Sequence, residues 1–331
     1  MALHFPHSHP PAAGELTEVV PGVFWLRMPL PFQLDHINLW LLRDGNGWVI
    51  IDTGFPEDHV RETWSLILDR LDGPVNKLVV THFHPDHLGL ATWLMDKTGA
   101  PLWMSTGEFL TAHVVWNEVG GHGARFMVEQ FRQHGLDAEN LGKFEKRGSG
   151  YHKAVPALPD HYNRLKAGDS LCIDGRRWQV VIGHGHAPEH VALYCVELGV
   201  LISGDMLLPR ISTNISVFAA TPDADALRWY LESLDDLARE IPRRDRRADA
   251  DRLARHQQPA IRPVRRNNLA VGAPAFLGEP LEIARGIGDL TPGFSERLAL
   301  FGSHDQGEIR LVLQHQLGPA AQELAAFGRR L

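Results

Sequence analysis

The chain has 331 residues, of which 44% are hydrophobic, and it carries a formal net charge of -7. A chain of this length can bury a large core, and its acidic balance argues against a nucleic-acid partner. No apolar run approaches the roughly 18 residues that a membrane span needs. We therefore expect a globular protein that acts on a small molecule rather than on nucleic acid or a membrane.

The N-terminal residues 1–14 are rich in histidine and proline and lack the apolar segment of a signal peptide, so we interpret them as a flexible end. The two cysteines, Cys172 and Cys195, each lie in an apolar, strand-like run. We expect both to be buried free thiols, which is compatible with a cytoplasmic location. A homodimer is compatible with the sequence.

Strand and helix patterns follow one another along the chain. Strand-like patterns are present at 17–28, 37–42, 48–52, 170–173, 178–182 and 191–196. Helical spacing is present in the apolar residues Val60, Trp64, Ile67, Leu68 and Leu71, and again in Leu227, Leu231 and Leu234. Strands followed by strands with helices are typical of two sheets that pack face to face, with helices outside.

The most informative stretch is Thr-His-Phe-His-Pro-Asp-His at residues 81–87. It follows an apolar run at 77–80, which we interpret as a buried strand, and precedes a helix-like segment at 88–97. His82 and His84 are two residues apart, so an extended chain directs both imidazoles to the same side. Pro85 turns the chain, which frees Asp86 and His87 to face a second ion. Imidazole and carboxylate are usual ligands of divalent metals, so this stretch predicts a metal site.

Two later strand ends carry further donors, at 183–190 and at Ser203-Gly204-Asp205. Residues 82–87 match the His-x-His-x-Asp-His signature of the metallo-β-lactamase superfamily in full. Together with the two later strand ends they occur in the order of that family's motifs, so the chain resembles the superfamily over residues 17–240. Gly185 to His190 resembles its third metal motif, Ser203 to Asp205 its bridging-aspartate motif, and Asp52-Thr53-Gly54 its early supporting turn. The resemblance implies an α/β protein with an αββα four-layer sandwich as the catalytic domain, over residues 15–240.

The same resemblance implies roles for single residues. His82, His84 and His186 would bind one ion, Asp86 and His87 would bind a second, and Asp205 would bridge them. Two divalent ions, Zn²⁺ or alternatively Fe²⁺ or Mn²⁺, could then share one hydroxide as the nucleophile, with Asp86 and Asp205 as catalytic carboxylates. The side chains that would orient the ligands are Asp52, His184 and His190.

Two regions fall outside these motifs. Residues 105–162 are longer than a simple connection and contain aromatic residues at loosely helical spacing, so we expect a helical insertion that either packs on the core or covers the metals. Residues 241–331 suggest a small, mainly helical C-terminal region. The superfamily usually supplies one more histidine, often as His-Gly-x-Pro, and the nearest match is His256 in His-Gln-Gln-Pro. The residues before His256 form a poor strand pattern, so the second ion has an uncertain ligand.

The nature of the bridging residue favours one branch of chemistry. Asp205 resembles the aspartate of glyoxalase II-like and lactonase-like hydrolases, whereas zinc β-lactamases carry cysteine or serine near this position. We expect hydrolysis of a thioester, a lactone or another ester. One alternative is an oxygenase with a single iron, similar to persulfide dioxygenases, which iron content and oxygen uptake would reveal. Another is a member that binds metal or ligand without catalysis.

Overall fold

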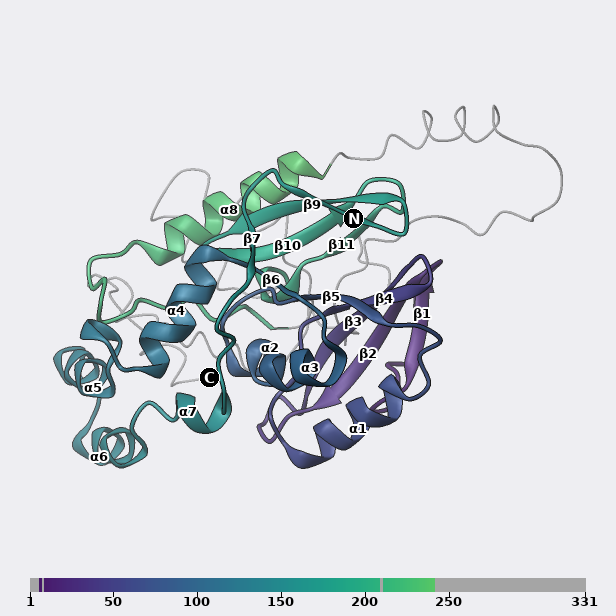
Figure 1. The fold of residues 1–331 in the computed structure, drawn as a ribbon. Coiled ribbons are helices and arrows are strands. Elements are labelled where there is room, and N and C mark those ends of the chain that lie inside the picture. Colours follow the sequence, from purple (N-terminus) through teal and green to yellow (C-terminus); the bar gives the residue numbers. More distant parts are fainter. Residues whose placement is uncertain (1–5, 8, 209–210, 242–331) are drawn as a thin grey trace, which may run out of the picture.

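The computed structural model describes residues 6–7, 9–208 and 211–241. The expected C-terminal region, with His256, lies outside these residues apart from Ile241. The described part forms two sheets with helices on their outer faces (Figure 1). None of its helices is both long enough and apolar enough to cross a bilayer.

Within the described residues the larger sheet has seven strands, which follow one another in chain order. Their bounds are β1 (Leu16–Val20), β2 (Val23–Pro29), β3 (His36–Asp44), β4 (Gly47–Ile51), β5 (Val75–Val79), β6 (Leu102–Ser105) and β7 (Asn163–Leu165). Strands β1 to β4 are antiparallel neighbours, whereas β4 to β7 are parallel neighbours. The smaller sheet is antiparallel throughout, in the order β11-β10-β9-β8. Its strands are β8 (Ser170–Ile173), β9 (Arg176–Gly183), β10 (His190–Cys195) and β11 (Val200–Ile202).

The helices connect and cover these strands. Their bounds are α1 (Asp58–Leu68), α2 (Pro85–Leu88), α3 (Ala91–Thr98), α4 (Thr106–Trp116), α5 (Ala124–Gln133), α6 (Ala138–Arg147), α7 (Tyr151–Ala154) and α8 (Ala226–Glu240), with short 3₁₀ turns at Gly120–His122 and Gly204–Met206. Helices α1 to α3 lie against the outer face of the larger sheet, and α8 lies against the outer face of the smaller one (Figure 1).

The alternation of side chains along the strands creates three apolar interfaces. On β4, Ile50 packs with the helices of the outer layer, whereas Val49 and Ile51 pack between the two sheets. The third interface joins the smaller sheet to α8, where Leu234 and Leu237 are buried. These interfaces separate four layers, so the expected αββα sandwich is confirmed.

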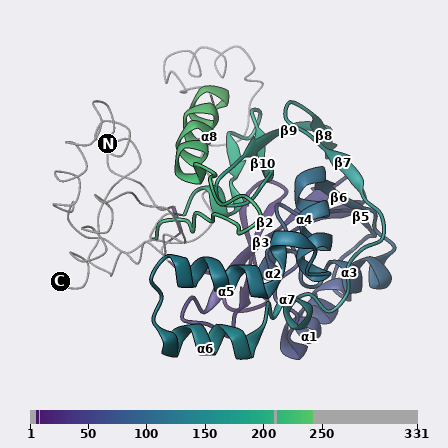
Figure 2. The same cartoon turned by 90° about the vertical axis from the view of Figure 1, so that its left-hand side faces the viewer.

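The segment 105–162 is helical, as expected, and contains α4 to α7. Helices α5 and α6 lie side by side beyond the sheets (Figure 2), and Val128, Phe131 and Leu141 form a small apolar cluster between them. Helix α7 packs closer to the core, because Tyr151 and Val155 at its two ends belong to the apolar layer around α1 to α3.

Three sequence predictions were wrong in detail. Residues 17–28 form two antiparallel strands, β1 and β2, rather than one, because the chain turns at Gly22, whose φ of 82° glycine adopts easily. Residues 88–97 contribute to two short helices, α2 and α3. Cys195 is buried as expected, but Cys172 is exposed because β8 is an edge strand with one face in solvent. Both cysteines are free.

Candidate metal centre

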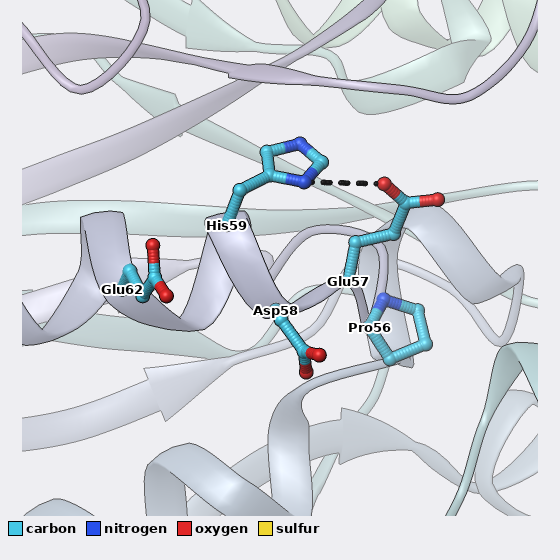
Figure 3. Close-up of a pocket in the computed structure, with 5 residues that line it drawn as sticks. All are labelled: Pro56, Glu57, Asp58, His59 and Glu62. Carbon is cyan, nitrogen blue, oxygen red and sulfur yellow. Dashed lines mark ion pairs between the residues drawn. The ribbon is translucent and has the colours of Figure 1, made fainter.

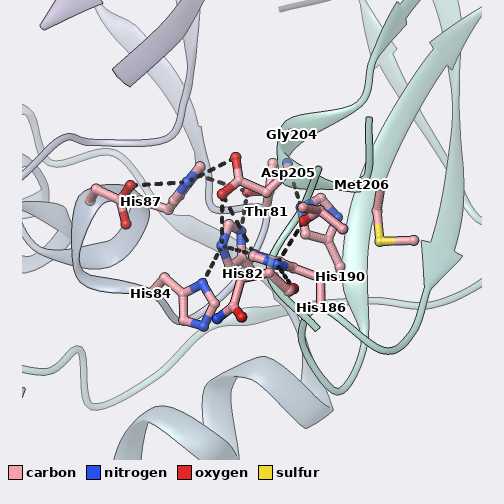
Figure 4. Close-up of polar contacts among 12 residues, drawn as sticks. Thr81, His82, His84, His87, His186, His190, Gly204, Asp205 and Met206 are labelled. Carbon is pink, nitrogen blue, oxygen red and sulfur yellow. Dashed lines mark hydrogen bonds and ion pairs between the residues drawn. The ribbon is translucent and has the colours of Figure 1, made fainter. Parts of the chain in front are cut away.

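Three chain segments that leave strand ends converge at one edge of the sandwich. They are the segment after β5, the segment between β9 and β10, and the turn after β11. Figure 4 shows the imidazoles of His82, His84, His87 and His186 close together, with the carboxylate of Asp205 near those of His82, His87 and His186. Residues more than a hundred positions apart therefore share one site, as the order of motifs led us to expect.

Two groups of three donors stand out among the described residues. The first contains His82, His84 and His186, and the second contains His82, His87 and Asp205. In the first group, Nε2 of His82 lies 2.9 Å from Nδ1 of His84 and 3.1 Å from Nε2 of His186. Within each group the donor atoms all lie within 4.8 Å of one another. This separation is small enough for one ion to contact all three donors.

The carboxylate of Asp205 connects the two groups. Its Oδ1 lies 3.4 Å from Nε2 of His87, and its Oδ2 lies 3.5 Å from Nε2 of His186. Its Oδ2 is also 4.0 Å from Nε2 of His82. Asp86 lies beside the second group, with its Oδ2 3.6 Å from Nε2 of His87. Each oxygen of Asp205 thus faces a different set of imidazoles, which is the arrangement of a bridging ligand.

The turn after β4 orients His87. Asp52 is buried, and its Oδ2 accepts a hydrogen bond from Nδ1 of His87 at 2.8 Å. Its Oδ1 accepts the backbone N–H of Thr81 at 2.7 Å, and the Thr81 hydroxyl also contacts both carboxylate oxygens. The Thr53 hydroxyl donates to the carbonyl of His87 at 2.7 Å. Because Nδ1 of His87 carries the shared proton, its Nε2 is the nitrogen available to a metal.

His186 is oriented in the same way by a backbone group. Its Nδ1 donates to the carbonyl of Asn214 at 2.7 Å, which leaves Nε2 to face His82 and Asp205. His190 contacts Asp205 itself, since Nε2 of His190 accepts the backbone N–H of Asp205 at 3.1 Å. Orienting contacts of this kind were predicted for Asp52 and His190.

Burial and mutual repulsion set the charges of the imidazoles. Burial lowers the pKa of His82, His84 and His190 well below the usual value, and it lowers that of His186 as well. Burial alone would also lower the pKa of His87, but the carboxylates of Asp205, Asp52 and Asp86 raise it well above the usual value. The four neutral imidazoles have free lone pairs, which metal binding requires.

The two carboxylates beside His87 differ from each other. Burial opposes ionisation of Asp205, but the nearby His87 holds the pKa of Asp205 far below its usual range. Burial raises the pKa of Asp86, an effect that His87 opposes and the charge of Asp205 reinforces. Asp205 is therefore the carboxylate that stays ionised, whereas Asp86 is better suited to carry a proton.

An unsatisfied polar atom indicates that these residues fit a metal ion. Nε2 of His87 is buried and has no hydrogen-bond partner with acceptable geometry, although it faces the two carboxylates. Buried polar atoms without a partner are rare in folded proteins and often mark the binding site of an ion. Together with the nitrogen and oxygen donors around it, this atom fits a divalent cation such as Zn²⁺.

The other predicted site residues do not join these groups. His184 is exposed, and its Nδ1 contacts the carbonyl of Pro188 at 2.6 Å rather than a donor residue. His256 lies outside the described residues. Sequence reasoning missed Thr81 and the carbonyl of Asn214. The position of Thr81 at the start of the first motif was a usable signal, whereas a backbone carbonyl carries no sequence signal.

A separate surface cavity of ≈ 580 Å³ lies at the start of α1 (Figure 3). It is lined by Pro56, Glu57, Asp58, His59 and Glu62. His59 already pairs with Glu57 at 3.2 Å, and neither donor group includes a residue of this cavity. We therefore assign the chemistry to the converging strand ends.

Comparison with known proteins agrees with this geometry. A family model described as the metallo-beta-lactamase superfamily matches residues 33–240, more than half of the chain. The chain belongs to the metallo-beta-lactamase superfamily. A solved structure of a beta-lactamase domain protein from Burkholderia ambifaria is 48% identical, with a TM-score of 0.60, over 69% of this chain and 68% of that one.

Two curated relatives of this superfamily chain are named as hydrolases. The probable metallo-hydrolase YqjP of Bacillus subtilis (strain 168) is 24% identical over 58% of this chain, and the match spans only 59% of that protein. The hydroxyacylglutathione hydrolase GloC of Haemophilus influenzae is 26% identical over 53% of this chain and 68% of that protein. Members of the superfamily use divalent metals, and the two donor groups are where such ions would bind in this chain.

Proposed function

We propose that this chain is a metal-dependent hydrolase that cleaves a thioester, a lactone or another carboxylic ester. The observation that carries the proposal is the position of Asp205, whose two oxygens face His87 and His186 respectively. One carboxylate between two sets of imidazoles suits a pair of ions, which we propose to be Zn²⁺, with Fe²⁺ or Mn²⁺ as alternatives.

The proposed ligands combine the members of the two donor groups with Asp86, which lies beside His87. His82, His84 and His186 would hold the first ion, and His87 with Asp86 would hold the second, while Asp205 would contact both. We propose His256 as a further ligand of the second ion. The bound ions would supply Lewis acidity and lower the pKa of water toward neutrality.

The chain's own residues contribute orientation and proton transfer. The Asp52 carboxylate accepts the N–H at Nδ1 of His87, so that Nε2, which faces Asp205, is the nitrogen that would give up its proton to bind a metal. The raised pKa of Asp86 supports a role in which its Oδ2 accepts a proton from the nucleophile and passes it to the leaving group. The neutral imidazoles of His82, His84 and His186 add no positive charge that would repel a cation.

Two observations support an ester-type substrate. The residue between the donor groups is Asp205, whereas zinc β-lactamases carry cysteine or serine near the equivalent place. The similarity to the hydroxyacylglutathione hydrolase GloC supports testing acyl thioesters first. Lactones and simple carboxylic esters follow in the same test, and phosphoesters serve as the comparison class.

The test combines metal analysis of the purified protein with turnover of thioesters, lactones and phosphoesters under added Zn²⁺, Mn²⁺ or Fe²⁺. We expect about two ions per chain and turnover of at least one carboxylic ester class. His186→Ala should lower kcat/KM by more than about a hundredfold, because a direct ligand matters more than its supports. His161→Ala is the matched control, since His161 is exposed and outside both donor groups.

Two results would contradict hydrolysis. Bound iron with oxygen uptake, and no ester turnover, would favour the oxygenase alternative. Bound metal without any turnover across the panel would favour a binding protein.

A further inference from the structure

The backbone of Phe83, between the ligand candidates His82 and His84, is held on both sides by the helical segment 105–162. Its N–H donates to Oε2 of Glu108 at 2.9 Å. Its carbonyl accepts the hydroxyl of Tyr151 at 2.6 Å. Glu108 lies in the first turn of α4, and Tyr151 begins α7. Both partners therefore come from residues 105–162, which the sequence predicts either to pack on the core as an insertion or to cover the metals.

These two hydrogen bonds satisfy backbone groups of Phe83 that no strand among the described residues pairs with. Strand β5 ends at Val79, so Phe83 has left the sheet and makes no strand pairing, although it is buried. A buried peptide group without a partner is costly, so its N–H and carbonyl must find partners elsewhere. Glu108 is fully buried and Tyr151 nearly so, which shields both bonds from water.

Glu108 also reaches the segment that carries His186. Its second oxygen, Oε1, accepts the backbone N–H of Glu189 at 2.6 Å. The side chain of Glu189 in turn accepts the N–H of Gly107 at 2.7 Å, and the Ser105 hydroxyl donates to the Glu189 carbonyl at 2.8 Å. One carboxylate at the start of α4 thus joins the two segments that supply the first donor group.

We propose that Glu108 and Tyr151 are positioning residues, which fix the spacing of His82 and His84 and hold this pair at a set distance from His186. The inference rests on the proposed function, because it assumes that these imidazoles bind a metal. It assigns the helical segment 105–162 a part in building the metal centre. A site whose supports are loose by about 1 Å loses much of its function, so such residues matter without touching the metal or the substrate.

The test uses two conservative variants with matched controls. Glu108→Gln keeps the shape of the side chain, but its amide nitrogen cannot accept a hydrogen bond. The N–H of either Phe83 or Glu189 therefore loses its acceptor, whether or not Glu108 is ionised in the wild type. Tyr151→Phe removes only the hydroxyl. Tyr162→Phe makes the same change within the segment, where the hydroxyl donates to Thr106 instead. Asp137→Asn is the control for Glu108→Gln, because Asp137 also accepts a backbone N–H in this segment.

The main readout is the affinity for Zn²⁺, measured by competition with a chromophoric chelator. We expect Glu108→Gln and Tyr151→Phe each to bind the first ion about ten- to a hundredfold more weakly, with an altered visible spectrum after substitution by Co²⁺. Both controls should bind within about twofold of the wild type, which is smaller than the effect of an orienting residue. Denaturant unfolding in excess chelator separates loss of affinity from loss of fold.

Each outcome has a distinct meaning. Unchanged affinity in both variants, with only a lower unfolding midpoint, would make the bonds merely structural and overturn the inference. If Glu108→Gln fails to fold, Tyr151→Phe still decides the question, since it removes a single hydroxyl. A wild type that binds no metal would instead refute the proposed function, which the two variants do not test.

Discussion

Asp52→Asn should weaken metal binding at one of the two donor groups more than at the other. Asp52 has a positive φ of 62°, a conformation that asparagine also tolerates, so the backbone can stay in place. The amide oxygen can continue to accept the N–H of Thr81, now at 2.7 Å from the carboxylate. The amide nitrogen then faces Nδ1 of His87, where the carboxylate accepts a hydrogen bond at 2.8 Å.

The expected size of the effect follows from this single contact. Loss of a hydrogen bond to a charged group costs about 1.5–3 kcal/mol. The amide N–H also favours a proton on Nε2 of His87, which would remove the lone pair that faces Asp205. Loss of an orienting partner weakens metal binding by about 10- to 100-fold, or about 1.4–2.7 kcal/mol. Among the described residues Asp52 bonds His87 directly and reaches His82, a member of both groups, only through the Thr81 hydroxyl, so the first group should be affected much less.

The assay is a metal titration against a chelator, with turnover followed in parallel. In Asp52→Asn the weaker of two binding steps should weaken further, while the tighter step changes by less than about twofold. Asp72→Asn removes the same charge at an exposed site, where Asp72 pairs with Arg43, and should leave both steps unchanged. Equal weakening of both steps, or of neither, would refute the view that Asp52 acts through the tautomer of His87.

Three further predictions concern the stability of the site. Gly204→Ala should lower the unfolding free energy by about 1–3 kcal/mol, measured in urea, because its Cβ would lie 2.6 Å from ring atoms of His190 at a φ of 48°. Ser233→Ala should cost about 1–3 kcal/mol in the same assay, since the N–H of His184 loses its acceptor at 2.9 Å. The metal-free protein should lose stability as pH falls below about 6.5. The histidines of the unfolded chain then bind protons, whereas buried imidazoles of the folded protein such as His82 stay neutral. Five histidines of lowered pKa act in this direction (His82, His84, His122, His186 and His190), whereas His87, Asp86 and Glu108, whose pKa values are raised, oppose them. Unfolding midpoints at two pH values in chelator check the sign.

Local chain geometry made the first motif predictable. His82 and His84 are two residues apart after a strand, and Pro85 opens α2, so the direction of each donor follows from a few dihedral angles. The strands and their layers were predictable for the same reason, since apolar residues on both sides of β4 require a cover on each face. Local patterns failed where the context decided burial, as for Cys172 on the edge strand β8.

The convergence of the three segments was not predictable from spacing. The contacts of His82 with His186 and Asp205 depend on how the two sheets pack, which local patterns do not encode. The resemblance of the motifs to a known family supplied that information. The supports of the site had a weaker signal: Ser105-x-x-Glu108 is the spacing of a capping box, and the Ser105 hydroxyl does accept the N–H of Glu108. That spacing predicts a helix start, but the reach of Glu108 to Phe83 depends on the tertiary fold.

The outer layers of the sandwich therefore do more than cover apolar surface. From the smaller sheet's side, Tyr230 on α8 donates to the carbonyl of Met206, next to Asp205, and Ser233 on the same helix accepts the N–H of His184. From the other side, Glu108 and Tyr151 hold the segment between His82 and His84. Strand ends alone leave their last peptide groups without sheet partners, and side chains from both outer layers supply those partners. Because neutral imidazoles and a carboxylate must stay close together before any cation joins them, this double support is what allows the fold to form the site in advance.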